Sequence, residues 1–232
     1  MIQGNESQGN EFRGNGYQRY VLGVTGSMGC GKSYACERLI EIAKSKSISV
    51  SYYNVDLIRR DMLGVNQEYF FVRNQLKEQF GKDILNSDSS IDSLRINDII
   101  YYDSQKMKEY KSIVNPCIED YLKKDISTAS GIALVEWAML AEDGLLAMVD
   151  YNTLVVSCDS ETQLDRHKDG DLPMNQIKKR ICNQLSNTEK ISQICKMQQE
   201  QGFGDLFLFD TSHNPGPEDY LMLFDKISAV LR

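Results

Sequence analysis

Short apolar runs alternate with longer stretches of helical periodicity along most of the chain. A run such as Leu154–Val156 contains no polar residue, which favours a strand buried on both faces of a sheet. Strands that alternate with helical stretches indicate parallel pairing, with helices on both faces. The pattern therefore predicts an α/β fold built on a five-stranded parallel sheet. The predicted strands are Tyr20–Val24, Ile48–Asn54, Ile132–Glu136, Thr153–Ser157 and Leu206–Phe209.

Two segments depart from this simple alternation. Residues 56–127 hold more helical pattern than one crossover between parallel strands requires, so we expect an inserted helical region beside the sheet. Residues 166–180 contain a short polar stretch between helical segments, which is typical of a mobile lid over a phosphate site. An ordinary solvated loop is the alternative. The predicted helices are Leu57–Leu63, Gln67–Phe80, Leu94–Tyr101, Ser104–Ile126, Glu161–Arg166 and Met174–Leu185.

A phosphate-binding loop follows the first predicted strand. Residues 26–33 read Gly-Ser-Met-Gly-Cys-Gly-Lys-Ser, and a helix-like stretch, Tyr34–Ala43, comes next. Backbone N–H groups of such a loop and the helix N-terminus hold an oxyanion. We expect Lys32 to reach the β- and γ-phosphates of a nucleotide and Ser33 to hold Mg²⁺. The residues predicted to bind nucleotide are Gly26, Met28, Gly29, Cys30, Gly31, Lys32, Ser33 and Tyr34, with Arg166 and Arg180.

Acidic side chains follow the second and third predicted strands. Asp56 comes just after the second strand, and Glu136 ends the third. The carboxyl ends of parallel strands face one crevice, so both should lie near the loop. Asp56 could accept a proton from an attacking hydroxyl, and either carboxylate could hold Mg²⁺ through water. The alternatives are a helix cap for Asp56 and a surface position for Glu136 or the following Glu142.

Basic residues gather around the predicted lid. They are Arg166, Lys168, Lys178, Lys179 and Arg180. Donors that close over a transferring phosphoryl group would stabilise its charge, so we expect at least one arginine to serve the site. Ordinary surface charges at helical spacing are the alternative. Arg59 and Arg60 follow Asp56, and one of them could face an acceptor phosphate.

Composition narrows the classes of protein that remain. The net charge of −7 gives no basic surface for nucleic acid, and no apolar run has the length of a membrane span. Residues 1–17 are rich in Gly, Asn, Gln and Ser, which predicts a disordered tail. The six cysteines show no metal-ligand spacing, so we expect reduced thiols and a cytoplasmic location. Within the loop, oxidation of Cys30 would block phosphate binding; a small residue filling the position is the alternative.

The chain resembles the dephospho-CoA kinase family along residues 21–210. The loop segment Val24–Ser33 resembles the family's LTGGIGSGKS, and Asn54–Arg60 resembles its DAD followed by IAR. Val135–Glu142 corresponds to the family's V-D/E-V-P-L-L-F-E, and Glu161–Arg166 to its ETQLKR. The segment Arg180–Lys190 keeps the closing arginine, glutamine and lysine. Positions that differ from the family pattern are Asn54, Asn115, Ala138 and Lys168.

The resemblance implies a P-loop NTPase-type three-layer fold with a helical CoA-side insertion and a small lid. It implies ATP-dependent phosphorylation of the 3′-hydroxyl of dephospho-CoA, giving CoA and ADP in the last step of coenzyme A biosynthesis. ATP and Mg²⁺ would be required, and the chain would be a monomer or a weak homo-oligomer. Asp56, Lys32 and Lys168 would be catalytic, and Arg60, Asn115 and Glu142 would contact the substrate.

Two other functions fit parts of the sequence. A (deoxy)nucleoside monophosphate kinase would share the loop, the lid and the arginines that follow the second strand. A catalytically weak nucleotide-binding regulatory module would fit the substitutions at Asn115, Ala138 and Lys168. The intact Lys32 and Asp56 favour an active kinase over such a module.

Overall fold

Five parallel strands form one sheet, which confirms the predicted fold class. A computed structural model of the protein describes residues 19–168 and 174–230, without the side chains of residues 175, 176, 179 and 180. The sheet order is β2-β3-β1-β4-β5, and every neighbouring pair is parallel. The strands are β1 (Arg19–Thr25), β2 (Val50–Asn54), β3 (Gly131–Glu136), β4 (Thr153–Ser157) and β5 (Leu206–Asp210).

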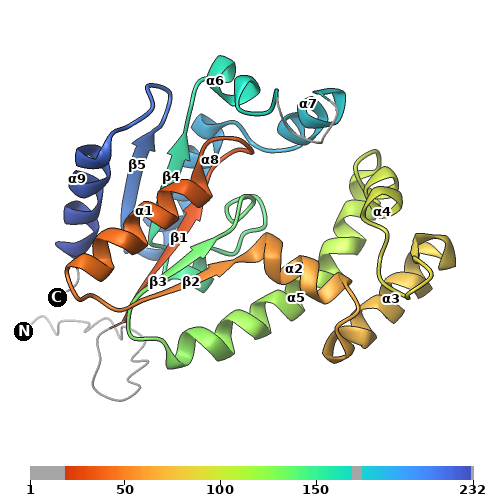
Figure 1. The fold of residues 1–232 in the computed structure, drawn as a ribbon. Coiled ribbons are helices and arrows are strands. Elements are labelled where there is room, and N and C mark those ends of the chain that lie inside the picture. The colour runs from red at the N-terminus through yellow and green to blue at the C-terminus, as the bar shows by residue number, and fades with distance from the viewer. Residues whose placement is uncertain (1–18, 169–173, 231–232) are drawn as a thin grey trace, which may run out of the picture.

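Helices cover both faces of this sheet (Figure 1). Leu22 and Val24 of β1 pack in the same core as α1 (Lys32–Ser45) and α9 (Pro217–Ser228). Val21 faces the opposite core, which contains residues of α5 (Ser104–Thr128). Neighbouring residues of a strand point to opposite faces, so β1 is apolar on both sides and lies at the centre of the sheet.

The helices between β2 and β3 extend from one end of the sheet, at the right of Figure 1. Met62, Leu76 and Ile118, from three of them, are fully buried in the core that also holds Val21. The predicted helix Gln67–Phe80 is a short 3₁₀ turn followed by an α-helix. These elements are α2 (Val55–Leu63), η1 (Gln67–Tyr69), α3 (Phe70–Phe80), η2 (Lys82–Ile84), α4 (Ser93–Ile100) and α5.

The remaining elements follow β3 and β4. They are η3 (Leu146–Val149), α6 (Ser160–Asp165), α7 (Met174–Cys182) and α8 (Asn187–Gln201). The predicted tail, residues 1–17, and residues 169–173 of the predicted lid lie outside the described residues. In the part of the chain that is described, no helix combines the length and the apolar character needed to cross a membrane.

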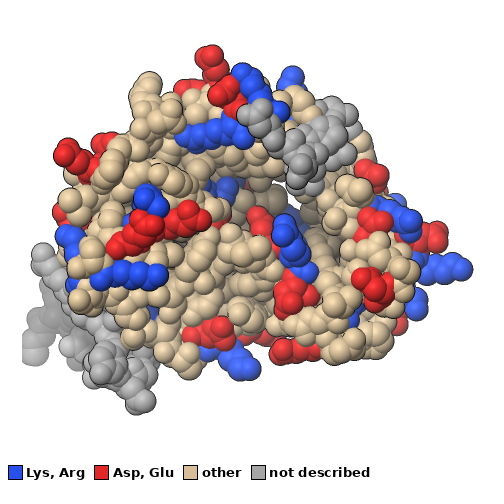
Figure 2. Space-filling view, in the orientation of Figure 1, with Lys and Arg blue, Asp and Glu red and all other residues tan. Residues whose placement is uncertain are grey.

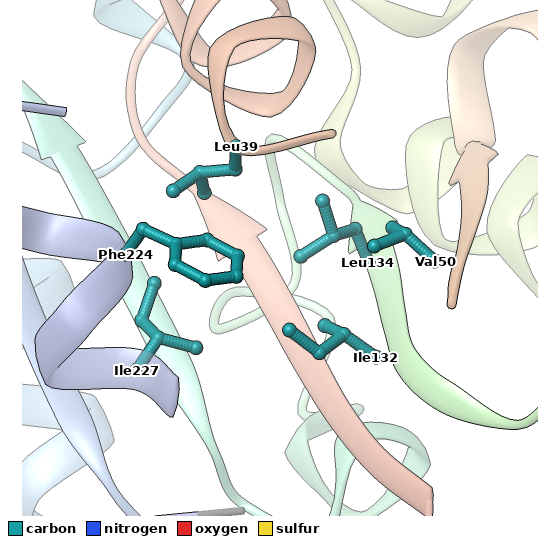
Figure 3. Close-up of a pocket in the computed structure, with 6 residues that line it drawn as sticks. All are labelled: Leu39, Val50, Ile132, Leu134, Phe224 and Ile227. Atoms are coloured by element: carbon teal, nitrogen blue, oxygen red, sulfur yellow. The ribbon is translucent and has the colours of Figure 1, made fainter. Parts of the chain in front are cut away.

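The face that α1 and α9 cover is closely packed. A void of only about 10 Å³ remains between these helices and strands β2 and β3 (Figure 3). It is lined by Leu39, Val50, Ile132, Leu134, Phe224 and Ile227. An apolar void of this size offers no polar partner for water or for a ligand. This side of the sheet therefore serves packing.

Candidate active site

The phosphate-binding loop joins β1 to α1, as the sequence predicts. Gly26 has a φ of +143°, and a Cβ atom there would lie 2.0 Å from the backbone oxygen of Val156. Only glycine fits so close an approach. Gly31 is left-handed, with a φ of +82°, and α1 begins at the next residue, Lys32. The loop therefore presents its backbone N–H groups at the N-terminus of a helix, where an anion binds.

Several loop groups have protein partners in this structure. Lys32, only 9% exposed, donates from Nζ to the backbone oxygen of Ser27 at 3.1 Å. The N–H of Met28 donates to Oε1 of Gln184 at 2.9 Å. Nε2 of Gln163 donates to the backbone oxygen of Met28 at 2.6 Å. The two glutamines therefore hold the loop from α6 and from the segment after α7, which sequence reasoning did not predict.

Glu136 lies beside the loop at the end of β3. Ser33 Oγ donates to Glu136 Oε1 at 2.7 Å. The other carboxylate oxygen of Glu136, Oε2, accepts from the Tyr52 hydroxyl and from Asn54 Nδ2, the latter at 3.1 Å. Burial, and then the hydrogen bond to Glu136, raises the pKa of Tyr52 well above its usual range. The carboxylate is 7% exposed, and these neutral donors compensate for its burial.

The Ser33 and Glu136 oxygens fit a magnesium ion. Mg²⁺ prefers oxygen ligands and takes few of them from the protein, completing its shell with water and phosphate oxygens. Within the described ranges, no group of three His, Cys, Asp or Glu side chains could hold a metal ion. The donor set therefore suits an ion that arrives with a nucleotide, rather than an ion that the protein binds alone.

Asp56 lies in the first turn of α2 and faces a large cavity. Asn54 caps this helix, because its Oδ1 accepts from the N–H of Leu57 at 3.1 Å. The alternative that Asp56 is the cap is therefore wrong. The Asp56 side chain is 70% exposed and forms an ion pair with Arg59 at 2.8 Å.

The cavity measures about 1030 Å³ and connects the loop to the helical region. Four of its lining side chains are cationic, Lys32, Arg59, Arg60 and Lys111, and two are acidic, Asp56 and Asp103. Figure 2 shows the molecule hollowed here, with Lys and Arg side chains in and beside the hollow. Residues from α4, α5 and the segments after α4 and β3 complete the wall, among them Asn97, Tyr101, Met107, Trp137 and Ala138.

Of the predicted lid residues, Arg166 contacts the loop but does not line the cavity. Arg166 donates to the backbone oxygens of Gly29 and Thr211, at 3.1 and 2.8 Å. Lys168 is exposed and forms an ion pair with Asp165. Arg180 is part of α7, but its side chain lies outside the described residues.

His167, which has no predicted role, lies directly against the loop. A Cβ atom on Gly29 would be 2.6 Å from its Nε2. That nitrogen is buried and has no hydrogen-bond partner among the described residues. Burial, and then the nearby charge of Lys32, lowers the pKa of His167.

Two predicted substrate residues lie outside the cavity wall. Asn115 is a half-buried residue of α5. Glu142 forms an ion pair with the fully buried Lys190 of α8 and accepts from the N–H of Leu185 at 3.1 Å. Burial lowers the pKa of Lys190, and the carboxylate of Glu142 opposes that shift. A substrate role for Asn115 and Glu142 stays a prediction.

Two further loop residues have neighbours that the sequence did not reveal. The Tyr34 ring is half exposed and meets Tyr220 of α9 edge-on, with ring centres 5.7 Å apart. The Cys30 and Cys158 sulfurs lie 3.2 Å apart, and both residues are free thiols.

A parallel sheet with a glycine-rich loop between its central strand and a helix defines a P-loop nucleotide-binding fold. A dephospho-CoA kinase family model matches residues 20–198, which span most of the described chain. The chain belongs to the dephospho-CoA kinase family, a family of kinases that transfer phosphate to a hydroxyl group. The predicted resemblance is thus confirmed.

Individual relatives agree with this assignment. The dephospho-CoA kinase of Oceanobacillus iheyensis is 31% identical over 179 residues, which cover 73% of this chain and 83% of the relative. That of Bacillus cereus is 26% identical over 176 residues, covering 74% and 83%. The crystal structure of TT1252 from Thermus thermophilus shares the fold, with a TM-score of 0.67 and 18% identity over 93% of this chain and 99% of that one.

Proposed function

We propose that this chain transfers the γ-phosphoryl group of ATP to the 3′-hydroxyl of dephospho-CoA, giving CoA and ADP. Membership of the dephospho-CoA kinase family supports this acceptor. One structural observation carries the proposal: a single cavity of about 1030 Å³ is lined both by Lys32 of the loop and by Asp56 of α2. Donor and acceptor can therefore meet in one cavity.

The phosphate loop is assigned to ATP. Its N–H groups and the Lys32 ammonium would surround the β- and γ-phosphates. Phosphate oxygens would there replace the present protein partners of the Met28 N–H and of Lys32 Nζ. Ser33 and Glu136 would hold Mg²⁺, which supplies charge neutralisation on the phosphate oxygens when bound. Arg166 and Arg180 are assigned to the same nucleotide, from the lid side.

Asp56 is assigned to the acceptor. Its carboxylate would orient the 3′-hydroxyl and take its proton as the hydroxyl oxygen bonds to phosphorus and ADP leaves. Arg59 also lines the cavity, and its ion pair with Asp56 places a cation beside this carboxylate. Lys32 and Lys168 are assigned to stabilise the negative charge that develops on the oxygens of the transferring phosphoryl group.

The acceptor's own charge supports the same orientation. Dephospho-CoA carries a diphosphate, and Arg60 and Lys111 line the cavity beyond Asp56. Cations grouped in one cavity attract such anions by Coulomb interaction. Because the chain has a net charge of −7, anionic ligands are attracted to this local excess of cations in the cavity rather than to the surface as a whole. A cytoplasmic location and a monomeric or weakly oligomeric state stay predictions.

A coupled assay of ADP release tests the proposal. Dephospho-CoA is compared with a panel of nucleoside and deoxynucleoside monophosphates and with ATP alone. We expect dephospho-CoA to give by far the highest kcat/KM. A higher kcat/KM for any monophosphate would identify that monophosphate, and not dephospho-CoA, as the acceptor. Tight ATP binding without transfer to any acceptor would instead support a regulatory module.

Two substitutions test the assigned roles. Lys32→Ala removes the ammonium that faces the phosphates, and Asp56→Asn removes the proton acceptor. Each should lower kcat by about 10²- to 10⁴-fold while the thermal unfolding curve stays close to that of the wild type. Asp61→Asn, in the same helix but outside the cavity wall, is the matched control and should keep full activity. Near-normal kcat in Asp56→Asn would remove the proton-acceptor role.

A further inference from the structure

The Asn54 side chain has partners at both ends of its amide group. Nδ2 donates to Glu136 Oε2 at 3.1 Å and to the Tyr52 hydroxyl oxygen at 3.2 Å. Oδ1 accepts from the N–H of Leu57 at 3.1 Å and so caps α2. The amide is planar, and its two ends move together. One side chain therefore contacts both Glu136 and the first turn of α2, which carries Asp56.

We propose that Asn54 is a positioning residue that holds both the Ser33–Glu136 pair beside the phosphate loop and the helix that presents Asp56 to the acceptor. The inference rests on the proposed function, because that function gives the two ends their roles. The inference goes beyond the proposed function because one side chain joins the nucleotide side and the acceptor side of the site.

Tyr52 is the second positioning residue. Its hydroxyl donates to the same Glu136 oxygen as Asn54, so Oε2 is engaged and Oε1 is left facing Ser33. A carboxylate held by two donors on one oxygen is fixed in rotation, and hydrogen-bonded partners of a ligand carboxylate tune its hold on a metal. The orientation of Glu136 toward Ser33 therefore depends on these two neighbours.

The identity of residue 54 matters for a specific reason. An amide offers one donor for Glu136 and one acceptor for the helix end. An aspartate could still cap α2, but it would place a second carboxylate about 3 Å from Glu136, where like charges repel. A serine could cap the helix without donating to Glu136, because its hydroxyl is too short to do both.

This difference allows the two functions of Asn54 to be separated. Asn54→Ser keeps the cap and loses the donor, whereas Asn54→Ala loses both. Tyr52→Phe loses a donor and leaves the cap. Tyr53→Phe is the matched control, because Tyr53 is the next residue of β2 and makes no hydrogen bond to Glu136 in the described structure.

Two quantities are measured for each variant. Calorimetry of ADP binding, with and without Mg²⁺, gives the gain in affinity that the ion provides. The second quantity is the KM for dephospho-CoA. We expect Asn54→Ser and Tyr52→Phe to lower the Mg²⁺-dependent gain about 10-fold at an unchanged acceptor KM. Asn54→Ala should lower the gain equally and also raise the acceptor KM, and Tyr53→Phe should change neither.

If Mg²⁺ raises the ADP affinity of Asn54→Ser as much as that of the wild type, Asn54 does not position Glu136. Equal acceptor KM values in Asn54→Ser and Asn54→Ala would overturn the role of the Asn54 cap in positioning α2. The ADP titration needs no acceptor, so it remains decisive if dephospho-CoA proves not to be the substrate. In that case, hydrogen exchange of the α2 amides replaces the KM, with faster exchange expected in Asn54→Ala only.

Discussion

At the scale of single residues, a pair of thiols lies within the nucleotide site. Cys30 belongs to the phosphate loop, and its sulfur is 3.2 Å from that of Cys158, which follows β4. Burial, and then the contact with Cys30, raises the pKa of the Cys158 thiol to about 12. Thiolates are the reactive form, so the Cys158 sulfur should react slowly at neutral pH and faster as the pH rises. A bond between the sulfurs would pull the loop out of its phosphate-binding shape.

We expect diamide to link Cys30 to Cys158. An S–S bond forms, and the two thiol hydrogens pass to diamide, which is reduced to its hydrazine. ADP binding should be lost with the bond and return on treatment with dithiothreitol. Peptide mass mapping and calorimetry measure both effects. Cys158→Ser should protect the protein and Cys195→Ser should not; equal inactivation of the two variants would refute the link.

The sequence predicted the residues whose type the loop itself requires. Gly26, Lys32 and Ser33 could be assigned because a phosphate-binding turn dictates them at fixed spacing. It did not predict Tyr52 or Gln184, whose contacts exist only after the sheet and α7 bring distant segments together. The residue type of Asn54 alone could have indicated a helix cap. No pattern in the sequence indicated its contact with Glu136.

At the scale of elements, the start of α8 determines where Lys190 lies. Ser186 Oγ accepts from the N–H of Glu189 at 3.3 Å, and Glu189 Oε2 accepts from the N–H of Ser186 at 2.9 Å. These reciprocal bonds form a capping box at the helix N-terminus. The Ser186 hydroxyl also donates to Glu189 Oε2 at 2.7 Å, and this bond, followed by the bond from the Ser186 N–H, lowers the pKa of Glu189. Lys190 follows directly and enters the core beside Glu142.

Ser186→Ala should lower the free energy of unfolding by about 1 kcal/mol, because it removes the cap. The folded pKa of Glu189 is below its unfolded value, so its part of the box is present above the usual glutamate pKa and is lost as pH falls through the lowered one. Urea unfolding over a pH series measures this. The gap between wild type and variant should narrow in acid, and a gap that stays constant would count against the box. Ser192→Ala, on the exposed side of α8, is the control.

Strands were predicted more accurately than helices. Each predicted strand overlaps its observed counterpart, because uninterrupted apolar runs are typical of a sheet buried on both faces. α8 received no predicted range, since its buried positions are few and include the charged Lys190. α9 also received none, although Tyr220, Leu223, Phe224 and Ile227 follow helical spacing and could have indicated it.

At the scale of the whole molecule, an acidic protein contains a locally cationic cavity, to which we assign its anionic ligands. Ligand that binds only the folded state stabilises that state. MgADP at 100 times its Kd should therefore add about 2.7 kcal/mol to the free energy of unfolding. Thermal unfolding with and without MgADP measures the effect. Lys32→Ala should lose most of it, and an equal rise in that variant would place ADP outside the loop.

The sequence predicted parallel strands but not their order. Placing β1 at the centre depends on its pairing with β3 and β4, which no local pattern encodes. The cavity is likewise a property of the assembled fold, because α2, α4 and the segment after α7 contribute to its wall from distant parts of the chain.

The phosphate loop lies early in the chain, but its supports come late. Ser33 and its partner Glu136 are 103 residues apart, Met28 and Gln184 are 156 apart, and Cys30 and Thr211 are 181 apart. Domains fold as units, and contacts of such long range form slowly. While the ribosome is still translating, the emerging chain therefore displays the whole loop motif without its supports. A prematurely released fragment would carry the signature of a nucleotide site and lack the site itself.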